Sequence, residues 1–200
     1  MRSRTAIIAA LAATPALAQV TFDETGTGGF DLSDDALNPT AFVFTEGDNT
    51  IAGNVTLSNG SPTAGDRDFF TFTILDGFEL VELFVNDWQP DNAGFVGINL
   101  GSTGIIPSGP DGGDTSQYIL ANLITGDDSG LDYLPTLRNN IATGVFNDAT
   151  IGPGTYTLVI QQTGSEFSEY DLSFVIAPIP APASAAALGL AALAATRRRR

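Results

Sequence analysis

Aspartates at the start of one expected strand are the side chains in this sequence best placed to bind an ion. Asp66 and Asp68 are two residues apart there, and a later segment rich in glycine and aspartate contributes Asp114, Asp127 and Asp128. Ca²⁺ takes about six to eight hard oxygen ligands, which carboxylates supply. The sequence therefore predicts a calcium site at which aspartates of the two segments, Asp66 and Asp68 with Asp114 or with the 127–128 pair, converge. The alternative is that they are turn residues hydrogen-bonded to their own backbone.

Four glutamates and one tryptophan raise the competing possibility of carbohydrate chemistry. A glycosidase needs two carboxyl groups across a cleft, one of them with a raised pKa. The spacing of the available glutamates singles out no such pair; they are Glu79, Glu82, Glu166 and Glu169. Trp88, between Asp87 and Asp91, offers a face on which a sugar ring can stack. Large aromatic side chains mostly serve packing, so burial of Trp88 in the core is the preferred interpretation.

The residue types that the chain lacks exclude most other reactions. It contains no cysteine and no histidine, and all eight of its basic residues are arginine. Thiol catalysis, Ser-His-Asp hydrolysis, HExxH proteolysis, thiolate-ligated zinc and Schiff-base chemistry are therefore excluded. Only carboxylates, hydroxyls and arginine remain to carry out a reaction. We therefore expect that the protein is not an enzyme, and Ca²⁺ is the one cofactor that its residues suggest.

The charge of the chain is distributed unevenly. Two of the eight arginines lie near the N-terminus and four end the chain, so residues 19–177 keep only Arg67 and Arg138. All 23 acidic residues lie in that body, whose formal charge is therefore 2 − 23 = −21. A field of this sign repels nucleic acid and anionic membranes. We therefore expect no nucleic-acid partner. The acidic surface is expected either to bind divalent cations or to keep the protein soluble.

Alternation with period two predicts an all-β fold. The clearest strand is 68–75, in which Phe70, Phe72 and Ile74 face one way, and 155–162 and 170–176 repeat the pattern. These three are expected to be central, with a hairpin across residues 161–169. Further strands are expected at 41–45, 50–57, 79–85 and 95–100. About eight short strands favour a two-sheet antiparallel sandwich of jelly-roll type, with one domain over 19–177.

Two details of this sandwich are also predicted. Val81, Leu83 and Val85 are expected to form one buried row. Residues 101–147 are expected to be a loop-rich insertion, in which 117–124 is either helical or extended.

Both ends of the chain have the composition of processing signals. Arg2 and Arg4 precede an apolar run at 6–13 and an Ala-x-Ala site at 16–18, so residues 1–18 are expected to be a signal peptide. At the other end, a proline linker with Pro180 and Pro182 leads into an apolar segment and four final arginines, Arg197, Arg198, Arg199 and Arg200. Residues 183–196 are expected to form a helix of about 21 Å, which would be marginal as a transmembrane anchor for a core of about 30 Å.

The order of proline motif, short apolar helix and arginine cluster at 178–200 resembles the PEP-CTERM sorting signals of Gram-negative bacteria. Ala181 stands where these signals usually carry an acidic residue, as in their variant forms. The resemblance implies export, transient anchoring in the inner membrane, cleavage by an exosortase-type protease and release to the cell surface or the extracellular space.

A second resemblance concerns the body. Residues 65–70, Gly-Asp-Arg-Asp-Phe-Phe, are followed by a Pro-Gly-Thr-Tyr strand at 153–156 and a Tyr-Asp-Leu-Ser-Phe strand at 170–174. This order is similar to bacterial pre-peptidase C-terminal domains, which implies a non-catalytic accessory or surface role. The sequence as a whole predicts an exported surface or extracellular-matrix protein with exopolysaccharide and calcium as expected partners. The alternative is a secreted carbohydrate-binding protein or carboxylate-dependent hydrolase.

Overall fold

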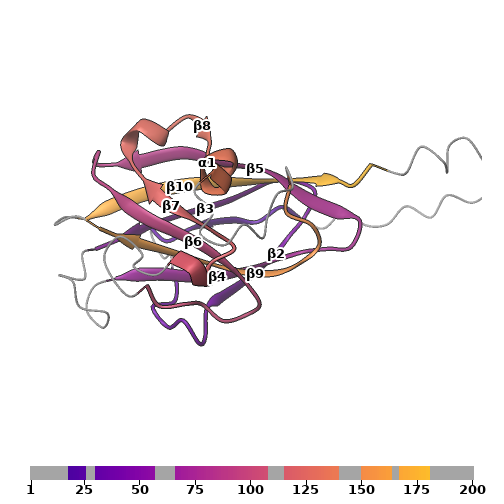
Figure 1. Ribbon diagram of the computed structural model, residues 1–200, viewed down its shortest axis with the longest axis horizontal. Coiled ribbons are helices and arrows are strands. Elements are labelled where there is room, and N and C mark those ends of the chain that lie inside the picture. Colours follow the sequence, from indigo (N-terminus) through magenta and orange to yellow (C-terminus); the bar gives the residue numbers. More distant parts are fainter. Residues whose placement is uncertain are drawn as a thin grey trace, which may run out of the picture.

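The alternating segments of the sequence form two five-stranded sheets that pack face to face (Figure 1). The computed structural model describes residues 18–25, 30–56, 66–107, 115–139, 150–163 and 167–180. Sheet A contains, in spatial order, β1 (Thr21–Asp23), β3 (Gly47–Val55), β10 (Ser168–Pro178), β5 (Phe78–Gln89) and β8 (Leu131–Asp132). Sheet B contains β2 (Thr40–Phe44), β4 (Arg67–Ile74), β9 (Gly154–Gln162), β6 (Gly94–Leu100) and β7 (Leu120–Ile124). The expected all-β, two-sheet sandwich is confirmed.

The central pairings of both sheets are antiparallel, and the two N-terminal strands add parallel edges. β10 pairs antiparallel with β3 and β5, and β9 pairs antiparallel with β4 and β6. β1 adds to β3, and β2 to β4, in parallel. Each N-terminal strand therefore covers one edge of its sheet, where backbone groups would otherwise face solvent.

The core lies between the sheets and is rich in aromatic rings. The rings of Phe44 and Phe72 from sheet B lie 5.1 Å apart, and Phe174 from sheet A lies 4.9 Å from Phe44 and 5.5 Å from Phe72, centroid to centroid. These spacings are those of favourable aromatic pairs. Phe72 and Phe174 follow the inward alternation predicted for β4 and β10, and Phe44 ends β2. The core residues expected on β4, β9 and β10 are confirmed.

The expected hairpin across residues 161–169 is wrong. β9 lies in sheet B and β10 in sheet A, so the chain crosses from one sheet to the other between them. Both strands point apolar side chains into the same interior, but from opposite sides. Alternation within each strand is the same whether two successive strands pair or cross over, and it therefore did not distinguish the two arrangements.

The buried row expected on β5 is only partly correct. Leu83 and Val85 are buried, but the third buried residue is Leu80, and Val81 is only partly buried. The pairing of β5 with β10 shifts register between Val175/Glu82 and Ile176/Leu80. An extra residue of this kind, a β-bulge, reverses the face on which the following side chains lie.

The expected insertion at 101–147 completes both sheets. Its 3₁₀ turn η1 (Thr115–Gln117) leads into β7, which settles that the following segment is extended, and after the turn η2 (Gly126–Asp128) β8 pairs with β5. The helix α1 (Leu134–Asn139) follows and lies beside β5 and β7, along the edge of the sandwich that β7 and β8 form (Figure 1). Tyr118 and Ala121 also pack on the outer face of sheet B. The insertion is therefore part of the sandwich.

Of the helices within the described residues, none combines the length and the apolar character that crossing a membrane requires. The expected apolar helix at 183–196 lies outside those residues.

Candidate metal centre

Five carboxylates from two distant parts of the chain converge at one end of the sandwich. Glu24 directly follows β1, Asp31 and Asp34 lie between β1 and β2, and Asp66 and Asp68 lie at the start of β4. We call these five residues the acidic cluster. β1 belongs to sheet A and β4 to sheet B, so the acidic cluster bridges the two sheets.

The carboxylates of the acidic cluster form two overlapping groups. One oxygen from each of Glu24, Asp31 and Asp68 lies within 4.8 Å of the other two, and the same holds for Asp31, Asp34 and Asp66. The first group contains the fully buried Asp68, whereas Asp31 and Asp34 are exposed. Oxygens that surround a cation at about 2.3–2.6 Å lie at such separations from one another. Asp31 is common to both groups.

The buried carboxylate of Asp68 is only half satisfied. Its Oδ2 accepts a 2.6 Å hydrogen bond from the Tyr170 hydroxyl, whereas its Oδ1 has no hydrogen-bond partner in the described parts of the chain. Asp68 has no solvent exposure. Leaving a buried polar atom without a partner costs free energy, so native proteins nearly always provide one. Asp68 also lies close to the carboxylates of Glu24 and Asp31. A buried carboxylate oxygen that has no hydrogen-bond partner and lies near other carboxylates is suited to bind a cation.

Glu24 is held in place by β3 and by the loop after β1. Its Oε1 accepts hydrogen bonds from the backbone N–H and the side-chain amide of Asn54, and its Oε2 accepts one of 3.0 Å from the Leu32 N–H. Gly53 leaves the space that this arrangement needs. A Cβ at position 53 would lie 2.5 Å from the Tyr170 hydroxyl oxygen and 2.9 Å from Glu24 Oε1. The glycine therefore admits both side chains to the acidic cluster.

The acidic cluster is electrostatically unfavourable without a cation. Burial, followed by the charges of Asp31 and Asp34, raises the pKa of Asp66 to about 7. Burial also raises the pKa of Glu24, and it raises that of Asp68 well above the usual range against the lowering effect of the Tyr170 hydrogen bond. Groups that share a site with like charges are stabilised when a positive ion is added. The electrostatics therefore favour a bound cation.

The structure brings together only some of the aspartates that the sequence predicted as calcium ligands. Asp66 and Asp68 belong to the acidic cluster, as the prediction requires. Asp127 and Asp128 follow β7, which is three strand spacings, or about 14 Å, from β4. Asp128 instead accepts hydrogen bonds from the backbone N–H and the hydroxyl of Thr125, and thereby caps η2. Asp114 lies outside the described residues.

Sequence reasoning missed Glu24, Asp31 and Asp34. The only local signal was a group of acidic residues before β2, and such groups are common on surfaces. Ser33 forms a bridge with Phe69, and the Arg67 N–H donates a 3.0 Å hydrogen bond to Asp34 Oδ1. These contacts bring the loop to β4 across more than 30 residues of sequence, and a local pattern contains no information about them.

Trp88 is a core residue, as preferred from the sequence. It is 1 % exposed, its indole N–H donates a 2.7 Å hydrogen bond to the Asn92 carbonyl, and its ring stacks with Tyr170 at 6.4 Å. A Cβ at position 94 would lie 2.2 Å from the ring, so Gly94 gives the ring its space. No face of the indole is left for a sugar.

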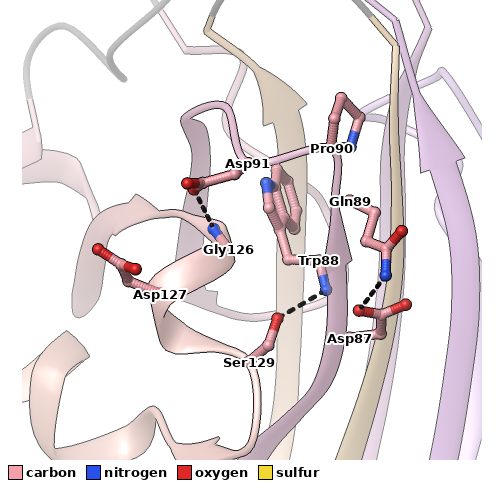
Figure 2. A pocket seen from close by; sticks show the side chains of 8 residues that line it. All are labelled: Asp87, Trp88, Gln89, Pro90, Asp91, Gly126, Asp127 and Ser129. Carbon is pink, nitrogen blue, oxygen red and sulfur yellow. Dashed lines mark hydrogen bonds between the residues drawn. The ribbon is translucent and has the colours of Figure 1, made fainter.

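An open pocket of about 370 Å³ lies beside Trp88. Figure 2 shows Asp91 reaching the Gly126 N–H, and Ser129 accepting a hydrogen bond from the Trp88 N–H, so η2 is fastened to β5 and the turn after it. The exposed polar groups of the pocket belong to Asp87, Gln89, Asp91 and Asp127. A second pocket of about 210 Å³ shares Asp87 and is lined as well by Asp23, Glu169 and Asp171. The two adjoining pockets form an acidic, polar surface around Asp87 on β5 of sheet A.

Glu79 and Glu169, two of the glutamates considered for hydrolysis, are far apart. Glu79 pairs with Ala177, and Glu169 pairs with Gln89, so the two are separated by eight residues along β10, or about 27 Å. Glu79 accepts a 2.6 Å hydrogen bond from the Thr150 hydroxyl, and Glu82 lies on the same half of β5. Glu166 lies outside the described residues. Glycosidases place their carboxyl groups about 5–10 Å apart, which Glu79 and Glu169 do not do.

Of the predicted sorting-signal residues, Pro180 is described and exposed, just beyond the end of β10. Pro182 and the arginines at 197–200 lie outside the described residues. Comparison with known proteins returned no family model, no curated protein and no solved structure that matches the chain. The functional proposal for this protein therefore rests on the geometry of the acidic cluster.

Proposed function

We propose that this protein is an exported, non-catalytic component of the cell surface or extracellular matrix, whose sandwich is stabilised by calcium at the acidic cluster. The observation that carries the proposal is the buried Asp68 carboxylate with its free Oδ1 among other carboxylates. A calcium ion would supply the missing partner of that oxygen. It would also offset the repulsion within the acidic cluster.

The chemistry of the donors favours calcium over other metals. All five side chains offer carboxylate oxygen, and the chain has no cysteine or histidine to attract softer ions. Mg²⁺ requires a nearly ideal octahedron and keeps several of its waters, whereas Ca²⁺ accepts irregular sets of many oxygens. Carboxylates contributed by a strand end, a loop and a second strand fit the calcium preference.

The ion would act as a structural clamp. Its ligands belong to the segment around β1 and to β4, and Asp68 is joined through Tyr170 to β10. Binding at this point would link the N-terminal strand, both sheets and the loop before β2. A protein that works at the cell surface has calcium available, and this chain has no cysteine with which to form a disulfide there.

Calorimetric titration with CaCl₂ and thermal melting with and without a chelator test the calcium proposal. At free calcium about 100 times Kd, binding adds about 2.7 kcal/mol, which corresponds to an increase in Tm of roughly 5–10 °C for a domain of this size. Asp68→Asn keeps the shape of the side chain and should abolish most of the increase. Asp127→Asn is the matched control, because Asp127 is an acidic residue outside the acidic cluster, and it should respond to calcium as the unaltered protein does.

A Tm that is the same with chelator and with calcium would exclude a stabilising ion. Equal losses in the Asp68 and Asp127 variants would show that calcium acts on the general charge of the protein. MgCl₂ at the same concentration should give a smaller increase in Tm than CaCl₂.

Export and sorting are proposed from the two terminal signals. The charge distribution supports them, because the arginines at the ends are suited to orienting a chain in a membrane and the body is almost purely acidic. Changing the four arginines at 197–200 to serine should reduce the amount of protein released from the inner membrane to the surface. Fractionation of cells that carry an exosortase-type protease, with an antibody against the body, measures this. Unchanged release would remove the sorting proposal and leave calcium binding intact.

Exopolysaccharide is the proposed macromolecular partner, and carbohydrate binding without hydrolysis is the second candidate function. Carbohydrate binding is favoured by the adjoining pockets around Asp87. Their carboxylates can accept hydrogen bonds from sugar hydroxyls, and their side-chain amide can donate hydrogen bonds to them. Co-sedimentation with purified neutral exopolysaccharide measures the binding, and Gln89→Ala and Asp87→Ala should weaken it. Binding that is unchanged in both variants would exclude this surface. Turnover that falls in Glu79→Ala or Glu169→Ala would support the hydrolase alternative.

A further inference from the structure

We propose that calcium at the acidic cluster keeps β1 paired with β3 of its own molecule, and that after calcium removal β1 exchanges onto β3 of a second copy of this chain. The inference rests on the calcium site proposed above. It concerns the edge strand that this site controls and assigns a partner to the edge of β3.

β1 is attached to the sandwich by a small number of contacts. It pairs with β3 over three residues, and two backbone hydrogen bonds flank the ladder, from Thr50 N–H to the Val20 carbonyl and from Glu24 N–H to the Ala52 carbonyl. The residues before β1 add three bonds that involve side chains, from Val20 N–H to Asn49 Oδ1, from the Gln19 amide to the Glu46 carbonyl and from the Thr45 hydroxyl to the Ala18 carbonyl. Phe22 is its main apolar anchor, with its ring 5.4 Å from that of Phe42. A three-residue parallel strand at a sheet edge is a weakly held element.

Glu24 connects this strand to the calcium site. It is the one member of the acidic cluster that directly follows β1, and its oxygens bind Asn54 of β3 and the Leu32 N–H. With an ion present, Glu24 is a ligand and β1 is fixed. Without the ion, departure of β1 removes one carboxylate from a group of like charges, which lowers the repulsion there. Because Glu24 can serve as a ligand only while β1 is docked, calcium and the docking of β1 stabilise each other.

Release of β1 would leave a β3 edge that readily pairs again. The Thr50 N–H, the Ala52 carbonyl and the Asn54 N–H bond to the β1 segment or to Glu24, and all three would lose these partners. β3 is nine residues long, and its other edge is fully paired with β10. A strand edge of this length attracts any chain that can complete it.

A second copy of the chain is the occupant that fits this edge best. The ladder that β1 makes with β3 within one molecule can form unchanged between two molecules, with the same hydrogen bonds and the same burial of Phe22. Exchange of an identical element is a low-cost route to oligomers for this reason.

Site-directed cross-linking tests strand exchange directly, because the chain has no cysteine of its own. Thr21→Cys on β1 and Thr50→Cys on β3 place thiols at residues that are register partners. The two full-length single variants are mixed either in calcium throughout or in chelator followed by calcium, and are then treated with a short bismaleimide. We expect a heterodimer of the two variants after the chelator step, in a yield on the order of tenfold or more above that in calcium.

Two controls define the register and the closed state. Glu82→Cys, on the exposed surface of β5, replaces Thr50→Cys in a parallel mixture and should give no heterodimer with Thr21→Cys. A single chain that carries both Thr21→Cys and Thr50→Cys should cross-link within itself in calcium and remain monomeric.

Each outcome bears on one of the two proposals. No heterodimer after chelation, with calorimetry showing that calcium still binds, overturns strand exchange and leaves the calcium site standing. Equal yields with and without calcium also overturn the inference, because the ion then does not control β1. A titration without any calcium binding refutes the site itself, whatever the cross-linking result.

Discussion

The hydroxyl of Tyr170 donates a 2.6 Å hydrogen bond to Oδ2 of Asp68, and this bond joins sheet A to sheet B inside the protein. Tyr170 is completely buried, and burial followed by the charge of Asp68 raises the pKa of its hydroxyl well above the usual range. The hydroxyl therefore stays protonated and remains a donor. It orients Asp68 so that one carboxylate oxygen is satisfied, and the other has no hydrogen-bond partner among the described residues.

Removing this donor should destabilise the sandwich and weaken calcium binding. Tyr170→Phe keeps the ring that stacks on Trp88 and removes only the hydroxyl, so Asp68 loses its single hydrogen bond. We expect a loss of about 1–3 kcal/mol in the free energy of unfolding, measured by urea denaturation in chelator. Tyr156→Phe is the control, since the Tyr156 hydroxyl bonds to the Gly152 carbonyl. It should leave the calcium Kd unchanged, and a Kd that is unchanged in Tyr170→Phe as well would contradict the orienting role.

The calcium-free protein should become less stable as pH rises through neutrality. The pKa of Asp66 in the folded state is about 7, above the ordinary aspartate value of 3.8 that applies to the unfolded chain. A carboxyl with a raised folded pKa stabilises the folded state below the unfolded value, and this stabilisation is lost as pH rises through the folded value. Glu24, Asp31, Asp34 and Asp68 are the charged groups that face Asp66 in the folded state.

Melting curves from pH 4 to pH 8 in chelator measure this loss. The Tm should fall as pH rises from about 4 to about 7 in the unaltered protein, and fall less in Asp66→Asn, which cannot ionise. In calcium the trend should reverse, because the ligands must lose their protons before the ion binds. Parallel curves for the two proteins in chelator would show that Asp66 does not titrate in this range.

A methyl group at position 53 should disrupt the acidic cluster. The Cβ of Gly53→Ala would overlap the Tyr170 hydroxyl and crowd Glu24, and both belong to tightly packed surroundings. We expect a loss of about 1–3 kcal/mol, as for other overpacked sites, together with weaker calcium binding. Gly152→Ala is the matched control, because no atom lies within 4 Å of the added Cβ, and it should change the free energy of unfolding by no more than about 0.5 kcal/mol. Equal effects of the two changes would contradict the close approach at Gly53.

The aromatic core should depend strongly on Phe174. Its ring contacts Phe44 and Phe72 in the opposite sheet, and its side chain is fully buried. Phe174→Ala should cost about 3–5 kcal/mol, because it removes buried area and leaves a cavity. The comparison is Val43→Ala on the edge strand β2, where the side chain is 49 % exposed and the expected cost is below about 1 kcal/mol. Urea denaturation of both variants measures the difference, and similar costs would contradict the packing described.

Much of the sandwich could be predicted because alternation is a local property. Phe70, Phe72 and Ile74 point inward whatever strand lies beside them, since successive side chains of a strand face opposite ways. Trp88 was expected in the core for a different reason, because large aromatic side chains mostly serve packing. The prediction from alternation failed at Val81, because a bulge changes the alternation without a signal in the residue types.

The amino-acid sequence predicted most of the strands, the acidic character of the body and the exclusion of thiol and histidine chemistry, because these depend on composition and short-range order. It also singled out Asp66 and Asp68. It did not predict β1 or β8, and it left the segment of β7 open. Only the tertiary structure decided which strands share a sheet, and that Glu24, Asp31 and Asp34 complete the carboxylate group around Asp68. The physical reason is that pairing and convergence depend on contacts between segments far apart in the chain, such as Ser33 with Phe69 and Tyr170 with Asp68. No local pattern of residues specifies those contacts.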